Sequence, residues 1–506
     1  MSRNDPAALR AYHEATAHSL ARLRNDPHVL DWANMPQPFK IYPELAPRPL
    51  PADIGTGPAP ALEAIARVGA CAAGDRELDQ RALARLLHLS AGVLRHRSWP
   101  GGEIWFRAAA CTGALYHIDL YLVTGPLPDL EAGVWHYGPH DHALRQLRQG
   151  DFRGTVVEAT ASEPSVVAAP VLLVYTSTFW RNAWKYRARA WRHAFWDAGT
   201  ILANLLALAA AASIPARIVQ AFVDDRLTAL LGLDPEQEGA LGVVALGTGA
   251  PPAPPAPAVL PPLAPRVLPY SREEIRYPAI LRAHAASALH DPAEVRAVRG
   301  AVHPPFVTPD GPAVPLAPLA PSAIDEPIEA VILRRGSTRR FLRRPISFEA
   351  LSTVVHAATR GFPTDCAVSP TCYLIVHAVD GLAAGTWVHD ASRDVVFQLR
   401  AGALRAEAGF LALQQELAAD AAANLYFLVD LEPVFAAMGG RGYRAAQLAG
   451  AVAGGRAYLA AYAQRLGATG LTFFDDEVVR CFSPHAAGMQ VMFLVAIGQS
   501  AGRQRA

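Results

Sequence analysis

The chain has 506 residues, 51% of them hydrophobic, with 46 basic and 45 acidic side chains and a net charge of +1. This composition excludes global disorder, and the balanced charge gives no general attraction to nucleic acid or to anionic membranes. The length predicts two domains, and the five cysteines, without a CxxC pair, indicate neither a disulfide framework nor a zinc site. The N-terminus has no apolar signal segment, so we expect a reduced, cytoplasmic compartment.

The first half of the chain begins with an extension and continues as a mixture of helices and strands. Residues 1–60 are predicted to form a helical start followed by a proline-rich stretch. Within residues 61–248, hydrophobic periodicity predicts helices over Leu78–Leu89 and Arg192–Ala212, and β-rich runs predict strands at IDLYLV and VLLVYT. The uncharged run Ala198–Ala216 approaches the roughly 20 residues of a membrane span. Its counterpart in the second half carries two arginines, so we predict a buried core helix.

Residues 249–325 separate the two halves. They begin with a stiff proline-alanine linker over 249–265 and include a short helical patch over 271–289. Residues 326–506 again mix the two patterns, with a helix predicted over Arg444–Leu466 and strands at CYLIVHAV, LYFLVD and VMFLVAIG. The predicted fold class is therefore α+β, with helices packed on a sheet of about four strands in each half.

The two halves are copies of each other. FVDD (222–225) matches FFDD (473–476), AGVWHY matches AGTWVH, and a YRA motif occurs in both copies, at 186–188 and 443–445. A repeat of this length is a duplicated domain, not a solenoid unit. The copies also differ. The second copy has RGSTRRF (335–341) where the first has RVGACAA (67–73), and the first has WKYR (184–187) where the second has RGYR (441–444). The segment RAAACTGALY (107–116) of the first copy has no counterpart in the second. Such complementary loss predicts one site that is built from both halves.

These motifs resemble the nitroreductase-like flavoprotein family. In the second copy, RGSTRRFLRRPISFEAL places Arg335, Ser337, Arg339 and Phe341 in register with the opening motif of that family. The first copy is similar to a narrower branch, the SagB-type dehydrogenases, which oxidise azolines to azoles in peptide natural products. This similarity rests on RAAACTGALYHIDLYLV, GVWHYGPHDHALRQLRQGD, WKYRARAWR and VVALG, and on the N-terminal YHEATAHS and FKIY.

The resemblance implies two tandem nitroreductase-like domains, each with a mainly antiparallel sheet, that pair as a fused pseudodimer. Family members are normally homodimers with two FMN sites at the subunit interface. Here one site is expected to work and its mirror image to be vestigial. The implied cofactor-binding residues are Arg335, Ser337, Arg339, Cys111, Thr112, Gly113, Gly470, Leu471 and Thr472. The implied catalytic residues are Lys185 and Tyr186.

The chemistry of these residue types agrees with the implied roles, although each motif also has a simpler interpretation. Arginine binds a phosphate dianion bidentately at any working pH, but RRGSTRRFLRR also suits a solvated basic turn. Gly113 permits close approach to a flat ring, as an ordinary turn glycine would. Azoline oxidation removes a ring proton, and a dry site can lower the pKa of Lys185 or Tyr186 toward neutrality. The alternative is a cationic helix start within an interface.

The histidines and one cysteine are assigned to structure. His136, His140 and His142 suit no common helical zinc pattern, so no metal is expected. Cys111 has no evident base partner, which favours a small packed residue over a nucleophile.

The acidic pairs and the remaining basic residues are assigned in the same way. The aspartate pairs at 224–225 and 475–476 recur in both copies, which indicates a role in the fold such as helix capping and not a catalytic dyad. Arg187, Arg189 and Arg192 are expected to pair with acids or with substrate.

The sequence therefore predicts an FMN-dependent dehydrogenase or oxidase that acts on an azoline or a related C–N bond in a peptide-derived substrate, with oxygen reoxidising the flavin. An NAD(P)H-dependent nitro or quinone reductase and a non-catalytic scaffold or substrate-binding protein are the two alternatives. The expected partners are a peptide-derived or small-molecule substrate and other biosynthetic proteins, with neither nucleic acid nor membrane. Further dimerisation of the pseudodimer stays open.

Overall fold

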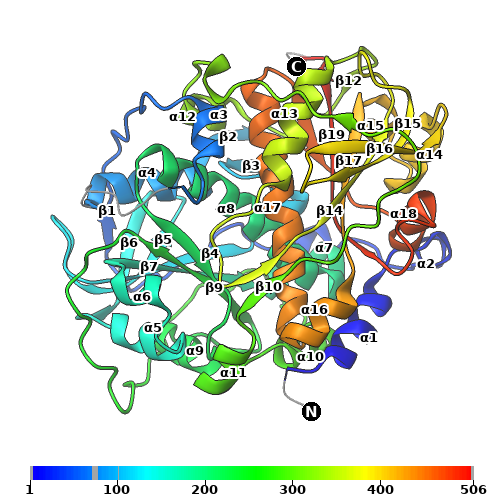
Figure 1. Ribbon diagram of the computed structural model, residues 1–506. Coiled ribbons are helices and arrows are strands. Elements are labelled where there is room, and N and C mark those ends of the chain that lie inside the picture. The colour runs from blue at the N-terminus through cyan, green and yellow to red at the C-terminus, as the bar shows by residue number, and fades with distance from the viewer. Residues whose placement is uncertain (1–3, 71–77, 101, 503–506) are drawn as a thin grey trace.

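The computed structural model describes residues 4–70, 78–100 and 102–502. The chain forms two lobes, each with helices packed on an antiparallel sheet (Figure 1), and the predicted α+β class is confirmed. In spatial order, the sheet of the first lobe contains β1 (Pro47–Pro49), β6 (Ala143–Gln149), β5 (Gly133–Gly138), β4 (Ile118–Thr124), β7 (Val171–Thr178), β9 (Glu238–Leu246) and β8 (Ala216–Val219). A separate hairpin joins β2 (Val93–Trp99) to β3 (Gly102–Arg107).

The second lobe repeats this order. Its sheet contains β11 (Val314–Pro315), β16 (Val395–Ala401), β15 (Gly385–Asp390), β14 (Thr371–Val376), β17 (Ala423–Val429), β19 (Gln490–Ser500) and β12 (Phe341–Leu342), and β18 (Gly467–Gly470) also pairs with β19. A short parallel pair joins β10 (Gly300–Val302) to β13 (Cys366–Val368). The predicted strands correspond to β4, β7, β14, β17 and β19. The sequence did not indicate β6 because its arginines, Arg145 and Arg148, are buried and pair within the fold.

Helices surround and separate the sheets. The first lobe has α1 (Pro6–Thr16), α2 (Leu20–Arg24), α3 (Ala61–Ala66), α4 (Gln80–Ala91), α5 (Arg153–Ala159), α6 (Pro164–Ala168), α7 (Phe179–Tyr186), α8 (Ala190–Ala211) and α9 (Asp224–Leu231). The linker and second lobe have α10 (Pro278–Ala286), α11 (Pro292–Ala297), α12 (Ile328–Arg334), α13 (Phe348–Thr359), α14 (Arg405–Leu411), α15 (Glu416–Asp420), α16 (Leu431–Met438), α17 (Arg441–Ala463) and α18 (Asp475–Phe482). The three predicted long helices correspond to α4, α8 and α17.

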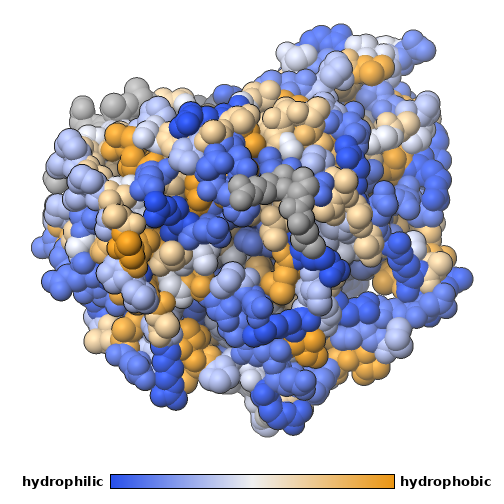
Figure 2. Space-filling view, turned by 90° about the horizontal axis from the view of Figure 1, so that it is seen from below, coloured by the Kyte–Doolittle hydropathy of each residue, from blue (hydrophilic) through white to orange (hydrophobic). Residues whose placement is uncertain are grey.

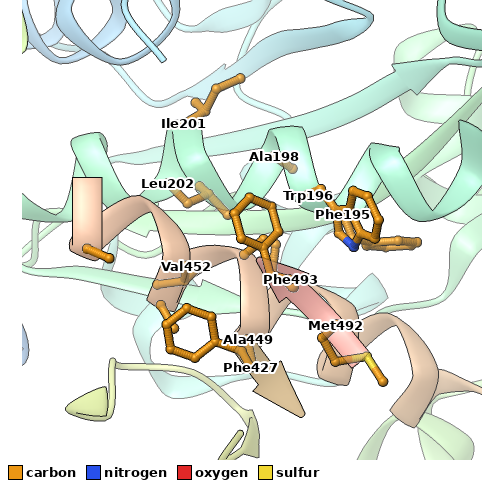
Figure 3. Close-up of a cluster of buried hydrophobic side chains, with 14 of the residues drawn as sticks. Phe195, Trp196, Ala198, Ile201, Leu202, Phe427, Ala449, Val452, Met492 and Phe493 are labelled. Carbon is orange, nitrogen blue, oxygen red and sulfur yellow. The ribbon is translucent and has the colours of Figure 1, made fainter. Parts of the chain in front are cut away.

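Helices α8 and α17 pack against each other where the lobes meet (Figure 1). A Cβ atom added at Gly199 of α8 would clash with Ala451, and one added at Gly455 of α17 would clash with Ala203. Each contact therefore sets a glycine against an alanine, which allows the helix backbones to approach closely. Aromatic and aliphatic side chains from both helices and from β19 fill the space around this contact (Figure 3).

Among the described residues, the helical segment Phe179–Ala211 is apolar and long enough to cross a membrane, but 94% of its apolar window is buried inside the protein. The face shown in Figure 2 carries hydrophobic residues in small groups among hydrophilic ones. The prediction of a buried core helix in the run Ala198–Ala216 is confirmed, with the helix ending at Ala211.

An approximate two-fold relation links the lobes. Trp191 of α8 stacks on Tyr443 of α17, with ring centroids 5.8 Å apart and planes 3° apart. Arg187 and Gly439, which follow α7 and α16, share a positive φ of 48° and 59°. These pairs make Tyr443 the counterpart of Trp191, so the predicted match between the two YRA motifs is wrong. The packing of the two long helices, and not the shared three-residue motif, therefore determines how the two copies align.

Crossed ion pairs join the lobes. Asp475, the first residue of α18, accepts hydrogen bonds from Arg189 and Arg192 at 2.9 and 2.5 Å, and all three side chains are buried. In the mirror position Asp224, the first residue of α9, pairs with two arginines of α17. Burial would raise the pKa of both carboxyls, but the facing guanidinium groups hold it below its ordinary value. The predicted role of these aspartates in the fold is confirmed, but the suggested helix capping is wrong, because neither helix has a side-chain cap and the carboxylates bind the opposite lobe.

The N-terminal helix and the linker helix occupy matching places. Helix α1 begins with PAALRA and α10 with PAILRA. Arg192 donates to the hydroxyl of Thr16, the last residue of α1, at 3.0 Å, and its counterpart Arg444 donates to the hydroxyl of Ser287, which follows α10, at 2.8 Å. The internal repeat therefore extends into parts of the segments 1–60 and 249–325.

Candidate active site

A cavity of about 650 Å³ lies where the lobes meet. The second lobe contributes the loop Arg334–Arg340 after α12, Tyr462 of α17 and the chain after β19. The first lobe contributes the β2–β3 hairpin and residues between Arg107 and Tyr116. Four predicted site residues line the cavity: Arg335, Ser337, Arg339 and Cys111. The cavity thus joins a motif from each copy.

The β2–β3 hairpin is a wall of the cavity that the sequence analysis missed. Arg95, Arg97 and Phe106 line the cavity from one face of the hairpin, since Arg95 lies opposite Phe106 in the register. The other face packs on the N-terminal segment, where the rings of Trp105 and Phe39 lie 5.4 Å apart. Arginines that alternate before a Pro-Gly-Gly turn in RHRSWPGGEIWFR were the available signal.

Arg335 is held by the first lobe. Its guanidinium donates hydrogen bonds of 3.0 and 2.6 Å to the carbonyl of Ala108, and Arg95 donates to the carbonyl of Arg335 at 3.1 Å. The Arg335 side chain is buried and lies over the ring of Tyr458, whose hydroxyl is 3.4 Å from that of Ser337. Arg335 therefore belongs to the contact between the lobes, and the start of this motif is not a solvated basic turn.

The cavity is strongly cationic. Seven arginines are among its described lining residues, and no aspartate or glutamate is: Arg95, Arg97, Arg107, Arg334, Arg335, Arg339 and Arg340. Of these, Arg334 has a carboxylate partner, Glu326 at 2.6 Å. Arg107 donates to main-chain carbonyls, and burial lowers its pKa to about 10, so it stays charged at neutral pH. An anion that enters the cavity meets positive charge without a matching carboxylate.

The buried carboxylate of Asp197 on α8 fixes the loop over residues 111–113, the CTG loop. It accepts hydrogen bonds from the backbone N–H and the hydroxyl of Thr112, at 2.9 and 2.8 Å, and from the thiol of Cys111 at 3.0 Å. His117 lies 3.0 Å from the same carboxylate. Burial, with the neighbouring carboxylate, raises the pKa of the Cys111 thiol, which therefore donates a hydrogen bond and is no nucleophile. An aspartate inside an apolar helix gave no sequence signal for this role.

Tyr186 approaches the same loop from α7. Gly113 has a φ of 63°, and a Cβ atom added there would lie 3.0 Å from the Tyr186 hydroxyl, so both the backbone and the close approach require glycine. The ammonium of Lys185 lies 5.4 Å from the centre of the Tyr186 ring. Neither side chain lines the described cavity itself; the Tyr186 side chain lies beside the loop that forms its wall.

Tyr186 cannot be a base at neutral pH. Burial raises the pKa of Tyr186, nearby Asp197 raises it further, and Arg339 opposes the shift only in part. The expectation of a lowered pKa is therefore wrong for this residue, because an apolar site disfavours a phenolate. Tyr186 keeps its proton and is a hydrogen-bond donor.

The predicted segment after β18 is connected to the cavity indirectly. The N–H of Gly470 donates to the Tyr458 hydroxyl, which neighbours Ser337. The N–H of Leu471 donates to a carbonyl of β19 at 3.2 Å, and the buried hydroxyl of Thr472 has no partner among the described residues. The two backbone donors predicted to face a flavin are thus already engaged.

A second, smaller cavity of about 210 Å³ lies at the corresponding position of the opposite side. Leu206 and Ala210 of α8 line it, at the positions where α17 has Tyr458 and Tyr462. Pro363 of the second lobe also lines it and would lie 3.3 Å from a Cβ atom added at Gly69. The proline therefore intrudes on this cavity, and among the described residues no aromatic ring stands where Tyr458 and Tyr462 lie on the other side.

The smaller cavity has little free charge among its described residues. Arg217 is the arginine that lines it and pairs with Glu163 at 3.1 Å. Arg67, the counterpart of Arg335, instead bonds to Ser213 at 3.1 Å and lies 3.8 Å from Glu63. Residues 71–77, which include the end of the RVGACAA motif, lie outside the described residues.

The histidines predicted to be structural contact three different partners. His136 lies 3.8 Å from Asp119. His140 lies 3.6 Å from Asp141, and His142 lies 3.0 Å from the Tyr137 hydroxyl. Within the described ranges, no group of three or more His, Cys, Asp or Glu side chains is placed to hold a metal ion. Arg187 pairs with Asp26, so the predicted pairing of the α8-region arginines with acids is confirmed.

Comparison with known proteins agrees with this architecture. The profile described as "Nitroreductase family" matches residues 75–248 and 332–499. The curated protein "Putative nitroreductase MJ1384" of Methanocaldococcus jannaschii is 22% identical over 154 residues, which cover 30% of this chain and 74% of that protein. A crystal structure of a putative nitroreductase from Anabaena variabilis matches 98% of this chain and 100% of its own, with 24% identity and a TM-score of 0.77.

The chain belongs to the nitroreductase family, because the family profile matches both lobes and most of the sequence. The likeness to the Anabaena structure extends the shared fold over nearly the whole chain, both lobes included.

Proposed function

We propose that the protein is an FMN-dependent oxidoreductase with one working site, in the larger cavity, and that it dehydrogenates an azoline or a related C–N bond in a peptide-derived substrate. The observation that carries this proposal is the cavity in which the Arg335–Arg339 motif of one lobe meets the CTG loop of the other. Family membership supports redox chemistry. The resemblance of the first copy to SagB-type dehydrogenases supports the reaction.

The residues of the larger cavity fit a flavin mononucleotide. Its volume lies in the range of about 300–1,000 Å³ that is typical of small-molecule sites. The buried Nε atoms of Arg95 and Arg107 have no hydrogen-bond partner among the described residues, so unused donors remain in the wall. Arg335, Ser337 and Arg339 would hold the nucleotide, and the arginines match the charge of a phosphate dianion. Bound FMN would supply the hydride acceptor that amino-acid side chains lack.

The first lobe would supply the proton chemistry. Lys185, whose ammonium lies near the Tyr186 ring, is the proposed base that takes the ring proton of the azoline. Tyr186 stays protonated and would donate a hydrogen bond to a substrate heteroatom. Asp197 is a positioning residue, since it holds the N–H and the hydroxyl of Thr112 and thereby fixes the loop against which Tyr186 packs. Closure of the cavity between two lobes would exclude water from the reaction.

Anaerobic mixing tests this function. FMN-loaded protein is mixed with a thiazoline-containing peptide or, separately, with NADH, and the yellow flavin absorbance is followed. Bleaching by the thiazoline, with formation of the thiazole, is the expected result. Bleaching by NADH alone, with colour restored by a nitro compound, would replace the proposal with a reductase. A protein that stays colourless after addition of FMN would point to a binding role without catalysis.

A further inference from the structure

The larger cavity holds more positive charge than one phosphate can balance. Six of its seven arginines have no carboxylate partner among the described residues. A phosphate group carries roughly two negative charges at neutral pH. The remaining charge lies in a partly enclosed site, where electrostatic interactions are stronger than in bulk water. A second anionic group is therefore the expected companion of the nucleotide.

The surplus charge lies on the β2–β3 hairpin. Arg95, Arg97 and Trp99 alternate along β2, so their side chains share one face of the hairpin. Arg95, at the inner end, is half-buried and bonds to the carbonyl of Arg335 at 3.1 Å. Arg97 lines the cavity and is exposed, and Trp99 near the tip is 54% exposed. The face thus leads from the base of the cavity out to solvent.

The hairpin is also specific to one copy. Between α4 and β4 the first lobe inserts β2 and β3, whereas between α13 and β14 the second lobe has only the short β13. The second lobe folds the same sheet without this hairpin, so the fold does not require it. Its opposite face is already occupied by the contact of Trp105 with Phe39, which fixes the arginine face toward the cavity.

We infer that this hairpin face binds the substrate and selects one that carries a carboxylate, held by Arg97 with Arg95 behind it. Trp99 would cover an apolar part of the same molecule. A guanidinium binds a carboxylate through two parallel hydrogen bonds, and Arg97 has no ion-pair partner within the described residues. The inference rests on the proposed function, in which the second-lobe arginines serve the nucleotide.

Calorimetry with a carboxylate and its neutral analogue tests the inference. Benzoate and benzamide are titrated into FMN-loaded wild-type protein, Arg97→Gln, Arg97→Lys and Arg217→Gln, and flavin per chain is measured in every sample. Arg217 is the matched control, because it lines the smaller cavity and is neutralised by Glu163. Arg97 is exposed, so its replacement should leave the fold and the flavin content unchanged.

The expected result is that benzoate binds wild-type protein at least about tenfold more tightly than benzamide, and that Arg97→Gln weakens benzoate binding about tenfold. Arg97→Lys should restore part of this loss, and Arg217→Gln should bind as wild type. Three results would overturn the inference: equal binding of benzoate and benzamide, no binding of benzoate, or an Arg97→Gln variant that loses flavin but still binds benzoate as wild type. A protein that binds benzoate through Arg97 but holds no flavin would refute the proposed function and leave the carboxylate site standing.

Discussion

The two cavities between the lobes occupy corresponding positions and differ in volume, in charge and in the residues that are buried behind them. The larger is about 650 Å³ and has seven arginines among its described lining residues; the smaller is about 210 Å³ and has one, which is paired. Polar residues of α7 and α8 are buried behind the larger cavity, whereas the residues at the matching positions of α16 and α17 are apolar. The polar residues are Asn182, His193, Asp197 and Thr200, and the counterparts are Val434, Ala445, Ala449 and Val452. Buried polar groups cost stability unless they are satisfied, and here they persist on the side where they position a loop.

The contacts that hold the lobes together show the opposite behaviour, since both copies keep them. Asp475 and Asp224 each bind two arginines of the other lobe. The difference teaches that the ion pairs between the lobes occur in both copies, whereas the large cationic cavity occurs on one side. Each of the following predictions would break or sharpen this comparison.

The largest expected effect is on turnover. Lys185→Ala should lower the rate of azoline oxidation about 10²–10⁴-fold, as loss of a general base does, while the protein keeps its flavin colour. Steady-state kinetics and flavin absorbance on the same sample measure both. Arg187→Ala is the control from the same helix end, because its side chain pairs with Asp26. Unchanged turnover in Lys185→Ala would remove this residue from the mechanism.

The next effect is on stability and should be symmetric. Asp475→Asn leaves Arg189 and Arg192 buried without a carboxylate, and Asp224→Asn does the same to two arginines of α17. Each variant should lower the free energy of unfolding by about 3–5 kcal/mol. Urea unfolding of the pair measures this. A large loss in one variant and almost none in the other would show that the lobes are not held by equivalent contacts.

Acid should weaken the same contacts. The folded-state pKa of both carboxyls lies below its ordinary value, which is about 3.9 in an unfolded chain. Their contribution to stability is therefore complete above about pH 4 and is lost as the pH falls through the lower folded-state pKa. Unfolding curves between about pH 6 and pH 2 should show the loss, and Asp475→Asn should show a shallower dependence. An identical slope in the variant would contradict the assignment.

The smallest effect distinguishes strain from function. Gly113 and Gly69 both have a positive φ, 63° and 86°, and each lies beside one of the two cavities. Replacement of either by alanine should lower the free energy of unfolding by about 1–2 kcal/mol. Gly113→Ala should also lower kcat/KM, since the new Cβ would meet the Tyr186 hydroxyl. Thermal unfolding and kinetics of the two variants separate these effects, and equal kinetic losses would refute a special role for the larger cavity.

Much of the fold followed from sequence because its central elements are long and strongly patterned. Helices α8 and α17 carry apolar residues through several turns, and β4, β7 and β19 are continuous β-rich runs. The β2–β3 hairpin was missed because its strands are rich in arginine. The register of the long helices was also missed, because it depends on how Trp191 and Tyr443 stack across the lobes.

The candidate site was predictable in outline and not in detail. Complementary loss between the copies pointed to Arg335 and Cys111, which line the same cavity. The role of Asp197 was invisible, because its partners at Thr112 and Cys111 come from a loop distant in sequence. The protonation of Tyr186 was mispredicted for the same reason: burial and the position of Asp197 determine its pKa.

The most direct test of the account is the amount of flavin per chain, measured by absorbance after saturation with FMN and removal of the excess. We predict about one flavin per chain in the wild type and in Arg67→Ala, and clear loss of flavin in Arg335→Ala and Ser337→Ala. Two flavins per chain, none, or equal loss from Arg67→Ala and Arg335→Ala would contradict a single site shared between the lobes.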